Sequence, residues 1–239
     1  MIPRIQHFER VGSTMDVIHE LAARGAEAGT IVVASEQLDG RGSRGRTWHS
    51  PPGGLWLSAL FRPPTLGGIE VVSLRVGLAV ARAVEPLASG RIQLKWPNDL
   101  MLNQRKVGGI LCEARWQGGA LGWVAVGIGL NVRNQIPAKL RGAAVSLAEE
   151  RPDITGEEVT EAVVTALEGV DFRAERLSAS ELEQFADRDW LRGREIRQPL
   201  RGTVTGLGDD GTLLVRTPEG PGVSLRSGSV QVAAVSRSR

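Results

Sequence analysis

Apolar positions along the chain follow two different periods, and each period predicts a different kind of element. The segment 70–88 has apolar residues at helical spacing, which predicts a core helix. The segments 30–36 and 55–62 are short and apolar, as in buried strands. Further strands are predicted at 3–11, 91–96, 100–102, 106–116 and 120–132. Further helices are predicted from Ser13 or Thr14 to Gly25, and at 156–169 and 179–190.

The strands predicted between 91 and 132 follow one another through turns, without intervening helices. This connectivity predicts an α+β fold, with a mixed or antiparallel sheet and flanking helices, rather than a doubly wound parallel sheet. Beyond Gly193 the chain consists of short strands separated by turns rich in Gly, Asp and Pro. We therefore expect a large domain at 1–190 and a small β domain at 191–239. The small domain should pack on the large one, because so short a unit has little core of its own.

Length and composition narrow the class of protein. The 239 residues suffice for a full apolar core. The single cysteine, Cys112, excludes a disulfide framework, and its face is shared with Ile110, so a core position is expected. The three histidines lie far apart in the sequence, so a zinc hydrolase is not expected. We expect no membrane span and a cytoplasmic protein, because no long apolar stretch or signal peptide is present.

The net charge of the chain is small, but the choice of basic residue is unusual. A net charge of +2 is too small for a dedicated nucleic-acid-binding protein. All but three of the 29 basic residues are arginine, and the lysines are Lys95, Lys106 and Lys139. Lys95 and Lys106 lie close together in sequence, which suggests that their positions need a compact ammonium that a planar guanidinium cannot replace.

The segment 37–54 is a long loop rich in glycine and arginine. Residues 40–45 spell GxGxxG, but the following RTWHSPPGG cannot form the helix that a dinucleotide-binding fold requires. No Asp or Glu occurs between 40 and 69, whereas arginines and two tryptophans do. Glycine N–H groups and arginine side chains bind phosphate or carboxylate. The loop therefore predicts a flexible clamp over an anionic nucleotide, with a single-stranded nucleic-acid site or a plain solvated loop as alternatives.

Paired glycines in two predicted strands indicate that something lies flat on the sheet. KVGGILCEA has two adjacent glycines, and VGIGLNV has Gly127 and Gly129 before a polar Asn131. Side chains at such positions would block the close approach of another group.

Five motifs, in this order, resemble those of the biotin protein ligases. They are VGSTMD (11–16), Gln37 with GRGSRGRTW (40–48), KWPNDL (95–100), KVGGILCE (106–113) and VGIGLN (126–131). The resemblance implies a class II synthetase-like ligase core and a small C-terminal SH3-like β-barrel. It implies that ATP activates biotin to biotinyl-5′-AMP, with Mg²⁺ on the phosphates. Biotin then passes to a specific lysine of a biotin carboxyl carrier protein. Members are commonly homodimers.

The resemblance also implies roles for individual residues. Around biotin it places Ser13, Thr14, Met15, Gln37, Arg41, Gly42, Ser43 and Lys95. On the ATP or adenylate side it places Arg44, Arg46, Trp48, Lys106 and Asn131. Lys95 and Arg41 are expected to be the catalytic cations, because a carboxylate that attacks an α-phosphate brings two anions together. None of these residues is expected to be a metal ligand.

Two positions depart from the family pattern. Met15 stands where the family usually has Asn, and Ser43 where many members have Arg; Arg44 or Arg46 could supply the missing contact. The chain begins about ten residues before the first motif, so no DNA-binding domain and no repressor function are expected. The alternative enzyme is a lipoate or octanoate protein ligase or transferase, which shares the fold class. The alternative that is not an enzyme is a single-stranded nucleic-acid-binding module.

Overall fold

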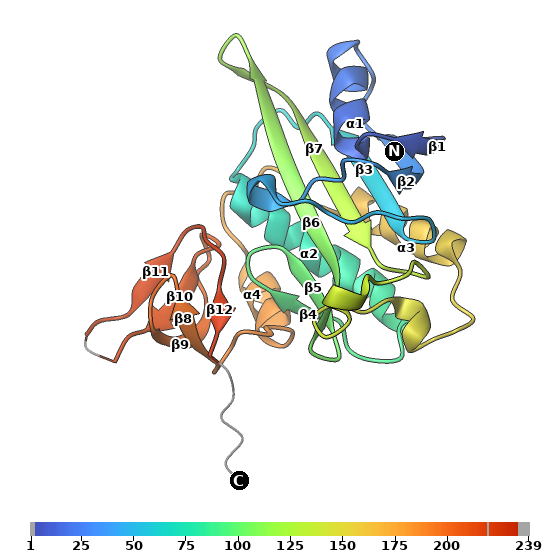
Figure 1. Ribbon diagram of the computed structural model, residues 1–239. Coiled ribbons are helices and arrows are strands. Elements are labelled where there is room, and N and C mark those ends of the chain that lie inside the picture. The colour runs from blue at the N-terminus through green and yellow to red at the C-terminus, as the bar shows by residue number, and fades with distance from the viewer. Residues whose placement is uncertain (1–2, 219, 234–239) are drawn as a thin grey trace.

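The computed structural model describes residues 3–218 and 220–233, which form two sheets and the helices around them (Figure 1). The larger sheet has seven strands in the order β1-β2-β3-β7-β6-β5-β4. In that order the strands are β1 (Arg4–Val11), β2 (Thr30–Gln37), β3 (Leu55–Phe61), β7 (Ala120–Leu130), β6 (Arg105–Gln117), β5 (Asp99–Leu102) and β4 (Gln93–Lys95). β1 and β2 are parallel and all other neighbours are antiparallel, so the predicted α+β fold with a mixed sheet is confirmed.

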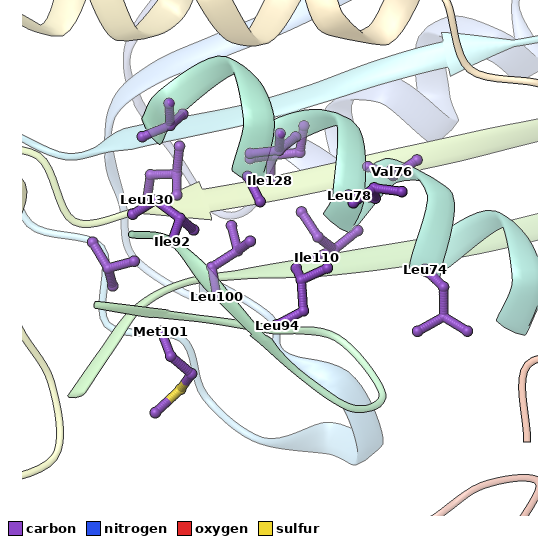
Figure 2. Close-up of a cluster of buried hydrophobic side chains, with 14 of the residues drawn as sticks. Leu74, Val76, Leu78, Ile92, Leu94, Leu100, Met101, Ile110, Ile128 and Leu130 are labelled. Atoms are coloured by element: carbon purple, nitrogen blue, oxygen red, sulfur yellow. The ribbon is translucent and has the colours of Figure 1, made fainter. Parts of the chain in front are cut away.

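One face of this sheet is covered by α2 (Ile69–Val84) and α3 (Gly156–Glu168). Figure 2 shows side chains of α2 meeting alternate residues of the strands, among them Ile110 and Ile128. α1 (Thr14–Ala23) packs on the opposite face through a second, smaller apolar cluster. Successive side chains of a strand point to opposite faces of the sheet. The glycines next to these isoleucines in the sequence, Gly109, Gly127 and Gly129, therefore face the side of α1.

Local sequence signals place the helix boundaries. The Ser13 hydroxyl caps α1 by accepting a hydrogen bond from the Met15 backbone N–H at 3.3 Å, as predicted. α3 and α4 (Ala179–Ala186) both begin with a capping box, formed by Thr155 with Glu158 and by Ser178 with Glu181. In the part of the chain that the structure describes, no helix combines the length and the apolar character needed to span a membrane.

Two predicted helices are shorter than expected. The helix predicted over 70–88 ends at Val84, and residues Glu85–Leu87 form a 3-10 turn that contains Pro86, which cannot continue a helix. The helix predicted over 179–190 ends at Ala186. Residues 188–190 run beside β4 instead, with the Leu94 N–H donating to Arg188 and the Trp190 N–H donating to Leu94. The open edge of β4 thus gains backbone partners that a helix would not give.

The C-terminal part forms a separate antiparallel sheet of five strands in the order β11-β10-β9-β8-β12. These strands are β8 (Glu195–Gln198), β9 (Gly202–Leu207), β10 (Leu213–Arg216), β11 (Val223–Leu225) and β12 (Gln231–Val232). The indole N–H of Trp96 donates to the Gly211 carbonyl at 3.0 Å, so this sheet contacts the larger one as expected. Closure into an SH3-like barrel and the boundary at 190/191 stay predictions. Residues 219 and 234–239 of the predicted small domain lie outside the described residues.

Candidate active site

A cavity of about 270 Å³ lies on the α1 face of the larger sheet. Three cationic side chains, Arg41, Arg46 and Lys106, line it, and no Asp or Glu occurs among the described residues of its wall. The wall also contains most of the residues that sequence analysis singled out: Ser13, Thr14, Met15, Gln37, Gly42, Ser43, Trp48 and Asn131. The cavity is therefore electrostatically suited to an anionic ligand.

The floor of the cavity is a pair of glycines that face each other across β6 and β7. Gly109 and Gly129 are direct partners in the sheet. The Trp48 side chain lies on both of them: a Cβ at Gly129 would be 2.5 Å from Trp48 Nε1, and one at Gly109 would be 3.5 Å from the indole ring. Side chains are thus excluded here as predicted, but the group that lies on the sheet is the protein's own tryptophan. Its Nε1 is buried and has no hydrogen-bond partner among the described residues.

One end of the cavity is lined by a chain of hydrogen-bonded polar side chains. The Thr14 backbone N–H and hydroxyl both donate to Gln37 Oε1, at 2.8 and 3.0 Å. The Ser58 hydroxyl donates to Thr14 Oγ1 at 2.8 Å, and Gln37 Nε2 donates to Ser50 Oγ at 2.8 Å. Ser50 and Ser58 were not singled out in the sequence, because neither stands in a recognisable motif. The chain holds Thr14 and Gln37 in fixed orientations at this end.

Met15 supplies an apolar wall beside this polar end. Its side chain is 3% exposed, and a Cβ at Gly127 would be 2.8 Å from its Sδ. Gly127 therefore makes room for Met15, just as Gly129 makes room for Trp48. At this position the chain offers van der Waals contact in place of the polar contact of an asparagine.

The arginines of the glycine-rich loop point to three different places. Arg41 forms an ion pair with Asp16 of α1 (Nη2–Oδ1, 2.8 Å). Arg46 lines the cavity and donates to the hydroxyl and the carbonyl oxygens of Ser43, at 3.0 and 3.2 Å. Arg44 lies outside the cavity wall and donates to Ser229 of the C-terminal part at 3.0 Å. Of the two arginines expected to compensate for Ser43, the structure brings Arg46 to the cavity.

The two neighbouring lysines are also separated by the structure. Lys106 lines the cavity, with Nζ 4.8 Å from the centre of the Trp48 ring and 2.5 Å from Asp99 Oδ1. Lys95 does not line it: its Nζ lies 5.2 Å from the centre of the Trp190 ring. Burial lowers the pKa of Lys95, and the nearby carboxylate of Asp99 partly opposes that shift. Lys95 faces Lys106 and Arg46, which both line the cavity, so its contact with the reacting groups stays a prediction.

The opposite end of the cavity contains Asn131 and a segment that sequence analysis missed. Asn131 is 6% exposed, and its Oδ1 accepts a hydrogen bond from Asn134 Nδ2 at 3.1 Å. Pro137, Leu140 and Ala143 form an apolar wall next to them. This segment has no motif and no regular period, so only the tertiary structure shows that it belongs to the site.

Together, the mixed sheet, its glycine floor and the cation-lined cavity are typical of a protein with a binding site for an anionic ligand. The chain belongs to the biotin/lipoate A/B protein ligase family, whose model matches residues 7–131. The resemblance inferred from the five motifs is thereby confirmed.

Individual relatives extend the likeness over nearly the whole chain. The bifunctional ligase/repressor BirA of Bacillus subtilis is 34% identical over 224 residues, which is 88% of this chain and 68% of that protein. The biotin–[acetyl-CoA-carboxylase] ligase of Paracoccus denitrificans is 32% identical over 219 residues, 83% of this chain and 88% of that protein. The structure of the Aquifex aeolicus biotin protein ligase in complex with biotin and ATP matches with a TM-score of 0.81 at 28% identity, covering 96% of this chain and 98% of that one.

Proposed function

We propose that this protein is a biotin protein ligase that works in two steps. In the first, a carboxylate oxygen of biotin attacks the α-phosphorus of ATP, and pyrophosphate leaves as biotinyl-5′-AMP forms. In the second, the amine of a carrier-protein lysine attacks the biotinyl carbonyl, an amide bond forms, and AMP leaves while the amine loses a proton to solvent. The observation that carries the proposal is a cavity with a polar end and three cations but no carboxylate among its described lining residues.

The polar end suits the bicyclic ring of biotin. The ureido group of that ring has two N–H donors and one carbonyl acceptor, and Ser13, Thr14 and Gln37 offer hydroxyl and amide groups of both kinds. The apolar part of the ring would contact Met15 and Leu111, which also line the cavity. With the ring in this place, the carboxylate of biotin would point along the sheet towards the cationic part of the wall.

The cations are proposed to make the meeting of two anions possible. Arg41, Arg46 and Lys106 would offset the repulsion between the biotin carboxylate and the α-phosphate, and would stabilise the charge of the transition state. Removal of one such donor typically costs about 2.7–4 kcal/mol. Lys95, which faces Lys106 and Arg46 from the end of β4, is proposed to contact the reacting groups together with Lys106.

The nucleotide is proposed to occupy the other end of the cavity, between Trp48 and Asn131. Mg²⁺ would enter with ATP. Since the described lining residues include no carboxylate, the triphosphate and water would hold the ion rather than this chain. Gly42 and Ser43 belong to the loop that would close over the adenylate, and closure would protect the reactive mixed anhydride from water.

The deciding experiment incubates the purified protein with biotin, ATP and Mg²⁺ and identifies the product by mass spectrometry. Biotinyl-5′-AMP should form, and addition of a biotin carboxyl carrier domain should convert it to biotinylated carrier. The same assay with lipoate tests the alternative enzyme; modification by lipoate and not by biotin would overturn the proposal. The absence of DNA binding, a homodimeric state and a cytoplasmic location stay predictions.

A further inference from the structure

Two asparagine side chains that follow the end of β7 are hydrogen-bonded to each other. The Val132 backbone N–H donates to Asn134 Oδ1 at 3.1 Å, and Asn134 Nδ2 donates to Asn131 Oδ1 at 3.1 Å. Both asparagines line the cavity, and Asn131 and Asn134 are 6% and 4% exposed. They form a buried chain of amides at the end of the cavity that is proposed to take the nucleotide.

The direction of this chain of hydrogen bonds is determined by its first donor. A backbone N–H can only donate, so the atom of Asn134 that faces Val132 is the carbonyl oxygen. The other atom of the same planar amide is Nδ2, a donor, so the atom of Asn131 that it meets is the acceptor Oδ1. Nδ2 is then the amide atom that Asn131 has left for the cavity. Within the described residues 3–218 and 220–233, Asn131 Nδ2 donates no hydrogen bond, so it is available to a ligand.

The backbone at both asparagines is held in place by other segments. The Asn131 N–H donates to the Val107 carbonyl oxygen at 2.8 Å. The Arg133 N–H donates to the Gly53 carbonyl oxygen at 2.7 Å, and a Cβ at Gly53 would be 3.1 Å from the backbone nitrogen of Asn134. Because the backbone is fixed, the hydrogen bonds of Asn134 need to set only the rotation of the two amide planes.

We infer that Asn134 is a positioning residue that keeps the NH₂ group of Asn131 turned to the cavity, where it donates to a ring nitrogen of the nucleobase. Pro137, Leu140 and Ala143 form the apolar wall beside Asn131, and such a wall suits a flat base better than a phosphate group. An amide turned the other way would place its oxygen against the ring nitrogen, so that two acceptors face each other. That the ligand is a nucleotide rests on the proposed function; the orientation of the Asn131 amide does not.

Asn134→Asp tests the inference because it reverses the direction of the chain. The new carboxylate can still accept from the Val132 N–H but cannot donate, so Asn131 should turn its NH₂ group towards it and its Oδ1 towards the cavity. We expect the Kd for ATP to rise about tenfold. The Kd for adenosine, which has the base without the phosphates, should rise by the same factor. A rise confined to ATP would mean that the new charge merely repels the phosphates, and would overturn the inference.

A double-mutant cycle shows whether Asn134 acts through Asn131. In an Asn131→Ala background, Asn134→Asp should change the Kd for ATP less than twofold, because the amide that it orients is absent. Asn103→Asp makes the same chemical change at an exposed turn outside the cavity wall, and this matched control should leave both Kd values unchanged. An equal effect of Asn134→Asp in both backgrounds would refute the role of Asn134 in positioning Asn131.

A second measurement needs neither ligand nor activity. The chain contains only four asparagines, so isotope-labelled asparagine gives four side-chain NH₂ signals that NMR can follow separately. In the unmodified protein the NH₂ protons of Asn131 should exchange with water faster than those of Asn134, because the Asn134 group donates to Asn131 Oδ1. Asn134→Asp should slow the exchange at Asn131 about tenfold. Exchange at Asn131 that is already slow, and that Asn134→Asp leaves unchanged, refutes the orientation. A failure of the unmodified protein to bind ATP would instead count against the proposed function, and the NMR result would still decide the orientation.

Discussion

The indole of Trp48 rests directly on the backbone of Gly129, where a Cβ would approach Nε1 to 2.5 Å. This contact explains why β7 has no side chain at a position that faces the cavity. It also fixes the height of the tryptophan above the sheet, and with it the space left for a ligand.

Gly129→Ala should displace Trp48 and damage the nucleotide end of the cavity. We expect the KM for ATP to rise about tenfold and the stability to fall by about 1–3 kcal/mol, as for other overpacked positions. The effect on KM should disappear in a Trp48→Ala background, where the clash is absent. Gly156→Ala, in α3 with no atom within 4 Å of the added Cβ, is the control and should leave KM unchanged. An unchanged KM in Gly129→Ala would contradict this account of the floor.

Lys106→Met should be strongly damaging, because Lys106 lies in the cavity wall. We expect adenylate formation to slow by ~10²–10³-fold, by analogy with the loss of one preorganised donor to a transition state. Single-turnover production of biotinyl-5′-AMP measures the rate, and Lys139→Met, at an exposed position, serves as the control. A rate in Lys106→Met close to that in Lys139→Met would contradict the role proposed for Lys106.

Asp16→Asn should strengthen ligand binding slightly. Asp16 holds Arg41 at 2.8 Å, but the two side chains are 52% and 39% exposed, so the pair contributes at most about 1 kcal/mol. Loss of this competing anion should lower the KM for ATP by up to about fivefold at low ionic strength, and less in high salt. Steady-state kinetics at two salt concentrations test this; a raised KM would show that Asp16 instead orients Arg41 for the ligand.

Asp189 should make stability depend on pH. Burial raises its pKa to about 6, so the folded state favours the neutral carboxyl. The stabilisation from the neutral form is complete below the unfolded pKa of about 4 and is lost as the pH rises through about 6. Asp189→Asn should therefore raise the free energy of unfolding at pH 7.5 by an amount on the order of 1–3 kcal/mol, and the Tm with it. At pH 4 the same substitution should leave the Tm nearly unchanged. The exposed neighbour Asp187→Asn is the control. Equal Tm changes at both pH values would contradict the prediction.

Cys112 should react slowly with thiol reagents in the folded protein. Burial raises the pKa of its thiol to about 12, so almost no thiolate exists at neutral pH. Cys112 is only partly buried, so a thiol-specific reagent such as DTNB should react slowly with the native protein for lack of thiolate, and at once in denaturant. Rapid modification of the native protein would place the thiol in an open environment.

The sequence by itself determined much of the local structure. Two examples are the helix cap at Ser13 and the core helix that begins at Ile69. Both, like the turns between strands, can be predicted from the hydrophobic period and from residues that are close together in the chain. The glycines of β6 and β7 and the cluster of arginines also predicted a site for an anionic ligand against the sheet. The inferences about helices and strands succeed because capping and periodicity depend mainly on neighbours in sequence.

Only the tertiary structure decided which of these residues meet. The pairing of β4, β5 and β6 puts Lys95 beside Trp190 and carries Lys106 over Gly109 into the cavity. Likewise, Arg46 rather than Arg44 lines the cavity, because Arg44 is held by Ser229 far along the chain. Proximity across a sheet depends on the register of strands that are distant in sequence, and a bulge such as the one between Leu100 and Met101 changes which side chains face each other.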